Sequence, residues 1–121
     1  MLTRLKINIT HRVDMCMNGE EAMNVMLKSY EAGMSYQLIL MDFNMPVMDG
    51  ITSTRKMREL FKENGKYERS TSKQPTILGL SANVLLSEEE KGLNAGMNQV
   101  LSKPLYFDVL NDALNYYNII I

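Results

Sequence analysis

The chain has 121 residues, of which 45% are hydrophobic and 22% are charged. These are the proportions of a globular protein and the length of one domain, so we expect residues 1–121 to form a single domain and not a disordered segment. The net charge of −1 provides no basic field for nucleic acid or anionic lipid, which excludes partners of that kind for this chain.

The cysteine content and the lengths of the apolar runs indicate the compartment. Cys16 is the only cysteine, which excludes an internal disulfide and fits a reducing environment. The longest apolar runs extend over a few residues, whereas a membrane-spanning helix needs about 20. We therefore expect a cytoplasmic domain in which this segment does not insert into a membrane.

The first residues predict a helix followed by an edge strand. Leu2, Leu5 and Ile9 recur at helical spacing, although the start of the helix is not visible. Residues 13–17 then alternate with a period of two, which is typical of a strand with one face more buried than the other.

Helices and strands alternate along the rest of the chain, because helical apolar spacing and short apolar runs follow one another. We expect helices at residues 20–32, 51–61, 87–95 and 107–117, and strands at residues 38–41, 76–80 and 99–102. Ser87 and Glu90 match a capping box at the start of the third helix, and Gly96 ends it. This order predicts an α/β fold, a doubly wound parallel sheet with right-handed crossovers and helices on both faces.

The helix at residues 51–61 has one charged face, which we expect to point to solvent. Its members include Arg55, Lys56, Arg58 and Glu59. Residues 62–74 are rich in Lys, Glu, Asn, Gly, Ser and Thr and predict a surface loop.

Three polar side chains stand at the ends of successive strands. Asp42 closes the strand at residues 38–41, whose four apolar residues predict burial on both faces. Ser81 follows the next strand, and Lys103 follows the last one. Because the carboxyl ends of parallel strands meet at the edge where ligands bind, we expect Ser81 and Lys103 to converge on Asp42.

The loop from Asp42 to Gly50 has the pattern D-x-x-M-P-x-M-D-G. Together with Ser81 and Lys103 in this order, it resembles the receiver domains of two-component response regulators and hybrid histidine kinases. The resemblance covers almost the whole chain and implies a flavodoxin-like receiver fold. It also implies phosphorelay signal transduction without enzymatic activity, with a histidine kinase or phosphotransfer protein as partner, and a larger hybrid kinase as one setting of the domain.

The resemblance implies a role for each of these residues. Asp42 would be the phosphoacceptor, Ser81 the switch hydroxyl, and Lys103 the side chain that contacts the phosphoryl group. The Asp42 carboxylate and the backbone carbonyl of Asn44 would be ligands of Mg²⁺.

The chain departs from the family pattern at two places. It enters the pattern inside the first helix, so the family's first strand and the acidic pair at its end are missing. Since Mg²⁺ requires about six oxygen ligands, we expect weak Mg²⁺ binding. Since the missing strand is central in the family's sheet, we also expect the chain to be marginally stable and to self-associate. The second departure is Val100, which replaces the family's usual aromatic residue and puts coupled switching with Ser81 in doubt.

Two other functions fit parts of the same pattern. The first is a degenerate, unphosphorylated receiver that serves as a protein interaction module, which the missing acids favour. The second is a phosphatase of the haloacid dehalogenase type, which also uses an Asp, a hydroxyl and a lysine at strand ends. Asn44 argues against the second, because it stands where that family has its general acid.

Overall fold

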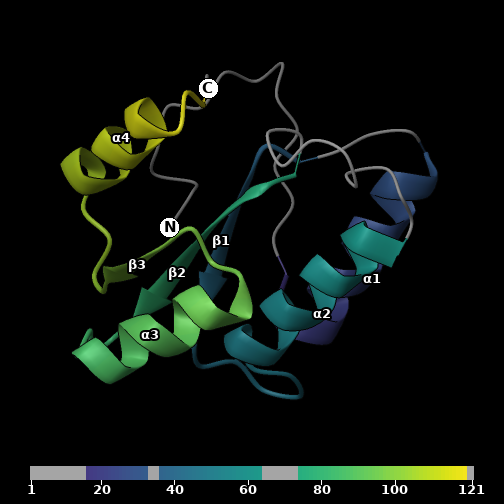
Figure 1. Ribbon diagram of the computed structural model, residues 1–121, viewed down its shortest axis with the longest axis horizontal. Coiled ribbons are helices and arrows are strands. Elements are labelled where there is room, and N and C mark those ends of the chain that lie inside the picture. Colours follow the sequence, from purple (N-terminus) through teal and green to yellow (C-terminus); the bar gives the residue numbers. More distant parts are fainter. Residues whose placement is uncertain (1–15, 33–35, 64–73, 120–121) are drawn as a thin grey trace.

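The computed structural model describes residues 16–32, 36–63 and 74–119, within which helices and strands alternate (Figure 1). The helices are α1 (Gly19–Glu31), α2 (Gly50–Glu63), α3 (Leu86–Ala95) and α4 (Phe107–Tyr116), and the strands are β1 (Leu38–Asp42), β2 (Thr76–Ser81) and β3 (Gln99–Ser102). The helix expected at residues 2–9 lies outside the described residues. Of the strand expected at residues 13–17, only Cys16 and Met17 are described, and neither is in a strand.

In the described part of the chain, the strands form one parallel sheet in the order β1-β2-β3. Asp42 of β1 pairs with Leu80 of β2, and Ser81 of β2 pairs with Ser102 of β3. The carboxyl ends of the strands are therefore nearly level, and the residues that follow them emerge at one edge. The parallel α/β class expected from the sequence is confirmed.

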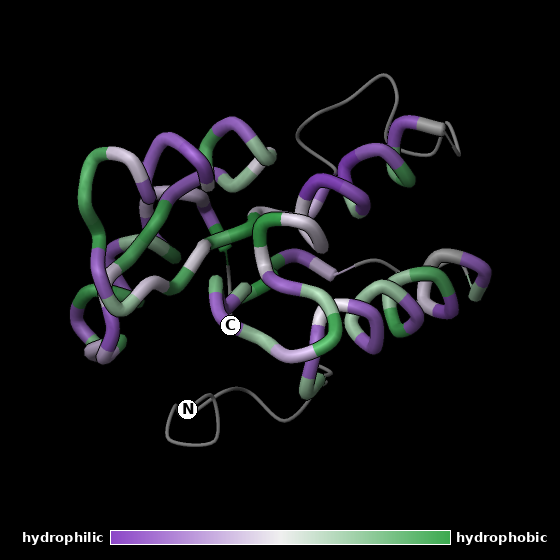
Figure 2. The backbone as a smooth tube through the Cα atoms, turned by 90° about the horizontal axis from the view of Figure 1, so that it is seen from below, coloured by the Kyte–Doolittle hydropathy of each residue, from purple (hydrophilic) through white to green (hydrophobic). Residues whose placement is uncertain are grey.

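The side chains of each strand alternate between two apolar clusters, as a period of two requires. One cluster lies between the sheet and helices α1, α2 and α3, and the other lies between the sheet and α4 (Figure 1). Hydrophobic segments accordingly run through the middle of the molecule, while the helical turns alternate in hydropathy (Figure 2). The first cluster contains Met26, Met41, Phe43, Met57, Phe61, Ile77, Met97 and Val100, and the second contains Leu78, Leu80, Leu101, Leu110 and Ala113.

Strand β1 is less buried than its sequence suggests. Four successive apolar residues predict full burial, but only Met41 is fully buried, whereas Leu38, Ile39 and Leu40 are partly exposed. The reason is position, because β1 is the outer strand of the described sheet and pairs only with β2 there. The central strand β2 shows the burial that the sequence predicts for β1.

The helix starts use different caps. Asn18 caps α1, because its Oδ1 accepts the Glu21 N–H at 2.9 Å. The capping box expected at Ser87 is wrong, since α3 begins one residue earlier and Leu85, its N-cap residue, makes no side-chain capping hydrogen bond. The expected stop is confirmed, because Gly96 adopts the left-handed conformation at φ 113° and ends α3.

Thr54 provides the first testable prediction. Its side chain on α2 is fully buried, and its Oγ1 finds no hydrogen-bond partner among the described residues. A buried hydroxyl without a partner costs about 1 kcal/mol or more, so we expect Thr54→Val to raise the free energy of unfolding by about 1 kcal/mol. Urea denaturation of the variant beside the wild type measures this change.

Thr52 is the matched control on the same helix, because its Oγ1 donates to Asp49 Oδ2 at 3.2 Å. Thr52→Val removes a hydrogen bond that is made, and should lower stability slightly or leave it unchanged. If both valine variants moved the urea midpoint in the same direction, the unpaired hydroxyl would not be the cause.

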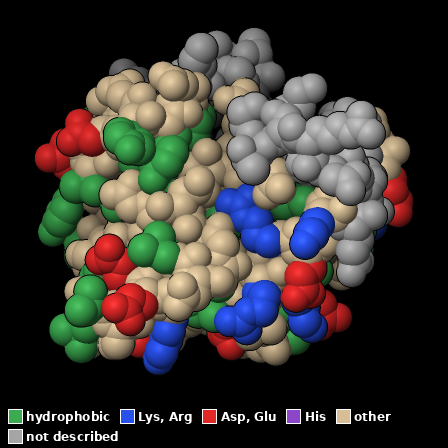
Figure 3. Space-filling model, viewed as in Figure 1, with side chains coloured by type: hydrophobic (Ala, Val, Ile, Leu, Met, Phe, Trp, Pro, Cys, Tyr) green, Lys and Arg blue, Asp and Glu red, His purple; other side chains and the backbone are tan. Residues whose placement is uncertain are grey.

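Charges of both signs are mixed on the visible surface over α2, while hydrophobic side chains are scattered over the side of α3 and α4 (Figure 3). This distribution agrees with the small net charge of −1. None of the helices in the described ranges is long and apolar enough to span a membrane.

Candidate functional site

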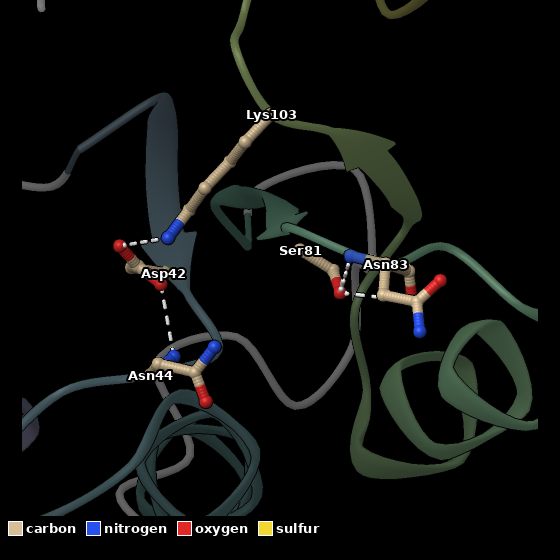
Figure 4. Close-up of polar contacts among 5 residues, drawn as sticks. All are labelled: Asp42, Asn44, Ser81, Asn83 and Lys103. Atoms are coloured by element: carbon tan, nitrogen blue, oxygen red, sulfur yellow. Dashed lines mark hydrogen bonds and ion pairs between the residues drawn. The ribbon is translucent and has the colours of Figure 1, made fainter.

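Asp42 and Lys103 meet at the carboxyl edge of the sheet. Asp42 is the last residue of β1, and Lys103 directly follows β3. Lys103 Nζ donates to Asp42 Oδ2 at 2.6 Å, with side-chain exposures of 30% and 36% (Figure 4). An ion pair this exposed contributes at most about 1 kcal/mol to stability. Its main effect is therefore to hold a cation beside a carboxylate that solvent can reach.

The second oxygen of Asp42 is also held. The backbone N–H of Asn44 donates to Asp42 Oδ1 at 2.9 Å, in a local turn of the kind that aspartate favours (Figure 4). Lys103 and Asn44 thus fix both carboxylate oxygens and set the orientation of the group. The bond between Lys103 and Pro104 is cis.

Ser81 lies at the same edge, but its hydroxyl is turned toward Asn83. Ser81 Oγ accepts the Asn83 N–H at 3.2 Å and lies 3.3 Å from the Asn83 carbonyl oxygen, to which it donates (Figure 4). The side chain is 4% exposed. The Lys103 N–H donates to the Ser81 carbonyl oxygen at 2.8 Å, so the backbones of these two candidate residues are joined while their side chains diverge.

The loop after Asp42 is closed by backbone hydrogen bonds. The Gly50 N–H donates to the Phe43 carbonyl at 3.2 Å, and the Phe43 N–H donates to the Leu80 carbonyl at 2.9 Å. At the tip, Val47 has φ 67°, a conformation that costs a β-branched residue about 1–3 kcal/mol. These hydrogen bonds and the Val47 conformation therefore restrict the backbone of the loop that follows Asp42 to one conformation.

Asp49 has a structural role that the sequence analysis did not assign. Its Oδ1 accepts the Thr52 N–H at 2.8 Å, which makes Asp49 the cap of α2. The signal was present, because an aspartate directly before the first residue of a helix is a preferred cap. Behind the loop, the Gly19 N–H donates to the Met48 carbonyl at 3.1 Å, and Ser53 Oγ donates to the Gly19 carbonyl at 3.1 Å. Both helices therefore support the loop that carries Asp42.

The described residues do not make up a magnesium site. Among them, no group of three or more His, Cys, Asp or Glu side chains gathers at one place. Asp42 offers a carboxylate at this edge, but its oxygens already accept from Lys103 and Asn44. Even with the backbone carbonyl of Asn44, the donors fall far short of the about six oxygens that Mg²⁺ requires.

Comparison with known proteins places the chain among signalling proteins. Residues 2–115 match the family model described as the response regulator receiver domain. Sensor protein EvgS of Escherichia coli K12 is 37% identical over 116 residues, which are 95% of this chain and 8% of that protein. Two-component response regulator 24 of Arabidopsis thaliana is 33% identical over 118 residues, which are 98% of this chain and 71% of that protein. The chain thus spans under a tenth of the sensor kinase but most of the response regulator.

Solved structures give the same result. The Saccharomyces cerevisiae receiver domain of Ssk1, crystallised with the histidine phosphotransfer protein Ypd1, is 32% identical at a TM-score of 0.67, over 83% of this chain and 66% of that chain. The receiver domain of sensor histidine kinase PA1611 from Pseudomonas aeruginosa, with magnesium in its active-site cleft, is 32% identical at a TM-score of 0.67, over 90% of this chain and 78% of that chain. This chain therefore belongs to the response regulator receiver domains, the signal-transduction modules of two-component phosphorelays.

Proposed function

We propose that this chain accepts a phosphoryl group on Asp42 from a histidine kinase or a histidine phosphotransfer protein. The observation that carries the proposal is the 2.6 Å contact between Lys103 Nζ and Asp42 Oδ2 at the carboxyl edge of the sheet. A carboxylate oxygen of Asp42 attacks the phosphorus of a phosphohistidine, and a P–O bond forms as the P–N bond breaks. The electron pair of the broken bond stays on the imidazole nitrogen, and the product is an acyl phosphate.

Lys103 supports this reaction electrostatically. Both reactants are anionic, and the phosphorylated side chain carries close to two negative charges. A lysine at hydrogen-bond distance from the acceptor oxygen offsets this repulsion, and the ammonium group can follow the charge to the phosphoryl oxygens.

We propose that Ser81 acts after phosphorylation as a switch hydroxyl. It stands at the same edge, and both of its hydrogen bonds are to the neighbouring Asn83 backbone. A rotation of the side chain would exchange these two bonds, at 3.2 and 3.3 Å, for one to a phosphoryl oxygen.

The partner would be a protein that carries a phosphohistidine. The Ssk1 receiver domain crystallises with the phosphotransfer protein Ypd1, and the relatives of this chain include two hybrid histidine kinases of Dictyostelium discoideum. We propose a partner of the same class here, in the cytoplasm, with this chain acting as a signalling module and not as an enzyme. A place within a larger hybrid kinase is part of the same proposal.

Magnesium binding is proposed to be weak. The described donor set falls short of a complete site, although the PA1611 receiver domain holds magnesium in its cleft. We expect the rate of Asp42 phosphorylation to keep rising over a wide range of Mg²⁺ concentrations without an early plateau. An early plateau would show that oxygen ligands beyond the described residues complete the site.

The function is tested by phosphorylation of the purified chain. A radiolabelled phosphotransfer protein or acetyl phosphate, with Mg²⁺ present, should label the wild type, and Asp42→Asn should reduce labelling to background because the nucleophile is lost. Asp49→Asn is the matched control, since this loop residue caps α2 and asparagine caps equally well.

Two results would contradict the proposal. Equal labelling of the wild type and Asp42→Asn would place the phosphoryl group elsewhere. A folded wild-type chain that takes no label from either donor would favour an unphosphorylated interaction module.

A further inference from the structure

Asn98 joins the sheet to α4 at the amino edge, opposite Asp42. Its backbone N–H donates to the Ile77 carbonyl at 2.8 Å, and its side-chain Oδ1 accepts the Ile77 N–H at 2.8 Å. Its carbonyl oxygen lies 3.3 Å from Tyr117 Oη, the donor at the end of α4. One residue thus connects the start of β2, the start of β3 and α4.

Arg58 of α2 links the end of α3 to Asn98 through hydrogen bonds. Its Nη2 donates to Asn98 Oδ1 at 2.9 Å, and its Nε donates to the Gly96 carbonyl at 2.9 Å. Its Nη1 donates to Gln74 Oε1 at 2.8 Å and to the Pro75 carbonyl at 3.0 Å. The charged outer face expected of α2 is therefore wrong for Arg58, which reaches inward to two connecting segments, the one before β2 and the one before β3.

All the acceptors of Arg58 in these bonds are neutral. The guanidinium is partly buried, and burial lowers the pKa of Arg58, although an arginine stays charged in proteins. Four of its five N–H groups are used, by Gly96, Gln74, Pro75 and Asn98. Loss of the guanidinium would remove this donor from all four oxygens, of which Asn98 Oδ1 would keep the Ile77 N–H.

The two ends of α3 are held very differently. The buried residues of α3 are Gly92 and Ala95, both in its C-terminal half. At the other end, Leu85 makes no side-chain cap, and Leu85 and Leu86 are 57% and 74% exposed. A helix end with few buried contacts and no cap opens at low free energy.

We propose that Arg58 is a positioning residue that clasps the C-terminal end of α3 to the amino edge of the sheet, so that α3 is fixed at this end and opens more readily at its N-terminal end. The end that opens more readily is the one that follows Ser81 and Asn83 at the carboxyl edge. The apolar core is not disturbed, because the N-terminal half of α3 contributes no fully buried residue.

Hydrogen exchange measured residue by residue by NMR tests the clasp. In the wild type, the amides of Glu89 and Glu90 should exchange at least about tenfold faster than those of Asn94 and Ala95. In Arg58→Met, exchange at the C-terminal end of α3 and at Ile77 should rise by about tenfold or more relative to the Phe43 amide, which donates to the Leu80 carbonyl at the carboxyl edge of the sheet. In Arg58→Lys, the exchange rates of these amides should lie between those of the wild type and those of Arg58→Met, because one ammonium group cannot reach all the acceptors.

Arg55 supplies the control, since it is an exposed arginine on the same helix. Arg55→Met should leave the exchange pattern of α3 unchanged. If Arg58→Met does not fold, Asn98→Ala removes one acceptor of the clasp and should give a weaker rise of exchange at the C-terminal end of α3. Ile77 is left out of this comparison, because its own N–H donates to Asn98 Oδ1. An equal increase at Phe43 and at Ala95 would reveal a general loss of stability and overturn the proposal. A wild type in which Ala95 exchanges as fast as Glu89 would also overturn it.

Discussion

Gly50→Ala is expected to lower the free energy of unfolding by about 2–3 kcal/mol and to displace Asp42. A Cβ at Gly50 would overlap the backbone oxygen of Asp42 and approach its carbonyl carbon to 2.8 Å. Neither atom can escape by a side-chain rotation, so the loop or β1 must move. The better helix propensity of alanine offsets at most about 1 kcal/mol of this cost.

Urea denaturation measures the loss, with Lys56→Ala as the control at an exposed position of α2. The control should change stability by no more than about 0.5 kcal/mol. Phosphorylation of Gly50→Ala should also be slower, because the shift moves the carboxylate away from Lys103. A variant with wild-type stability and labelling would show that the loop can relax around the added methyl group.

Lys103→Met is expected to slow the phosphorylation of Asp42 by about 10- to 100-fold while changing stability by less than about 1 kcal/mol. The slower rate follows from the loss of the cation 2.6 Å from the acceptor oxygen, and the small stability change follows from the exposure of the pair. Initial rates with acetyl phosphate as donor measure the phosphorylation of Asp42, and urea denaturation measures the change in the free energy of unfolding.

Lys91→Met is the matched control, because Lys91 pairs with Glu88 at 3.5 Å on the surface of α3. It removes the same charge from the chain without touching the Asp42 edge, and its rate should equal that of the wild type. Lys103→Arg should recover part of the rate, since the charge returns with a different shape. Equal rates for Lys103→Met and Lys91→Met would mean that net charge, and not the local contact, governs the reaction.

The strand ends could be predicted because they depend on topology alone. Once β1, β2 and β3 are parallel, Asp42, Ser81 and Lys103 must emerge at one edge, whatever their neighbours do. The direction of the Ser81 hydroxyl was not predictable in this way. The hydroxyl can point either to the Asn83 backbone or to the space near Asp42. The local turn from Ser81 to Asn83 favours the first direction, because it offers both an N–H and a carbonyl oxygen to the hydroxyl.

Arg58 shows a second limit of sequence patterns. It stands beside Arg55, Lys56 and Glu59 on a face that reads as exposed, and those three are exposed. Its acceptors lie 16 to 40 residues further along the chain, in connections that have no periodic pattern. Only the folded chain brings these carbonyl oxygens within reach of one guanidinium.

The two faces of the sheet differ in how readily they can change over evolutionary time. The cluster under α1, α2 and α3 is built largely from methionine, including Met26, Met41, Met57 and Met97. Unbranched, polarisable side chains adapt to altered neighbours, whereas the branched leucines under α4 fit one arrangement more closely. Substitutions should therefore accumulate singly on the methionine side, while those on the leucine side should occur as compensating pairs.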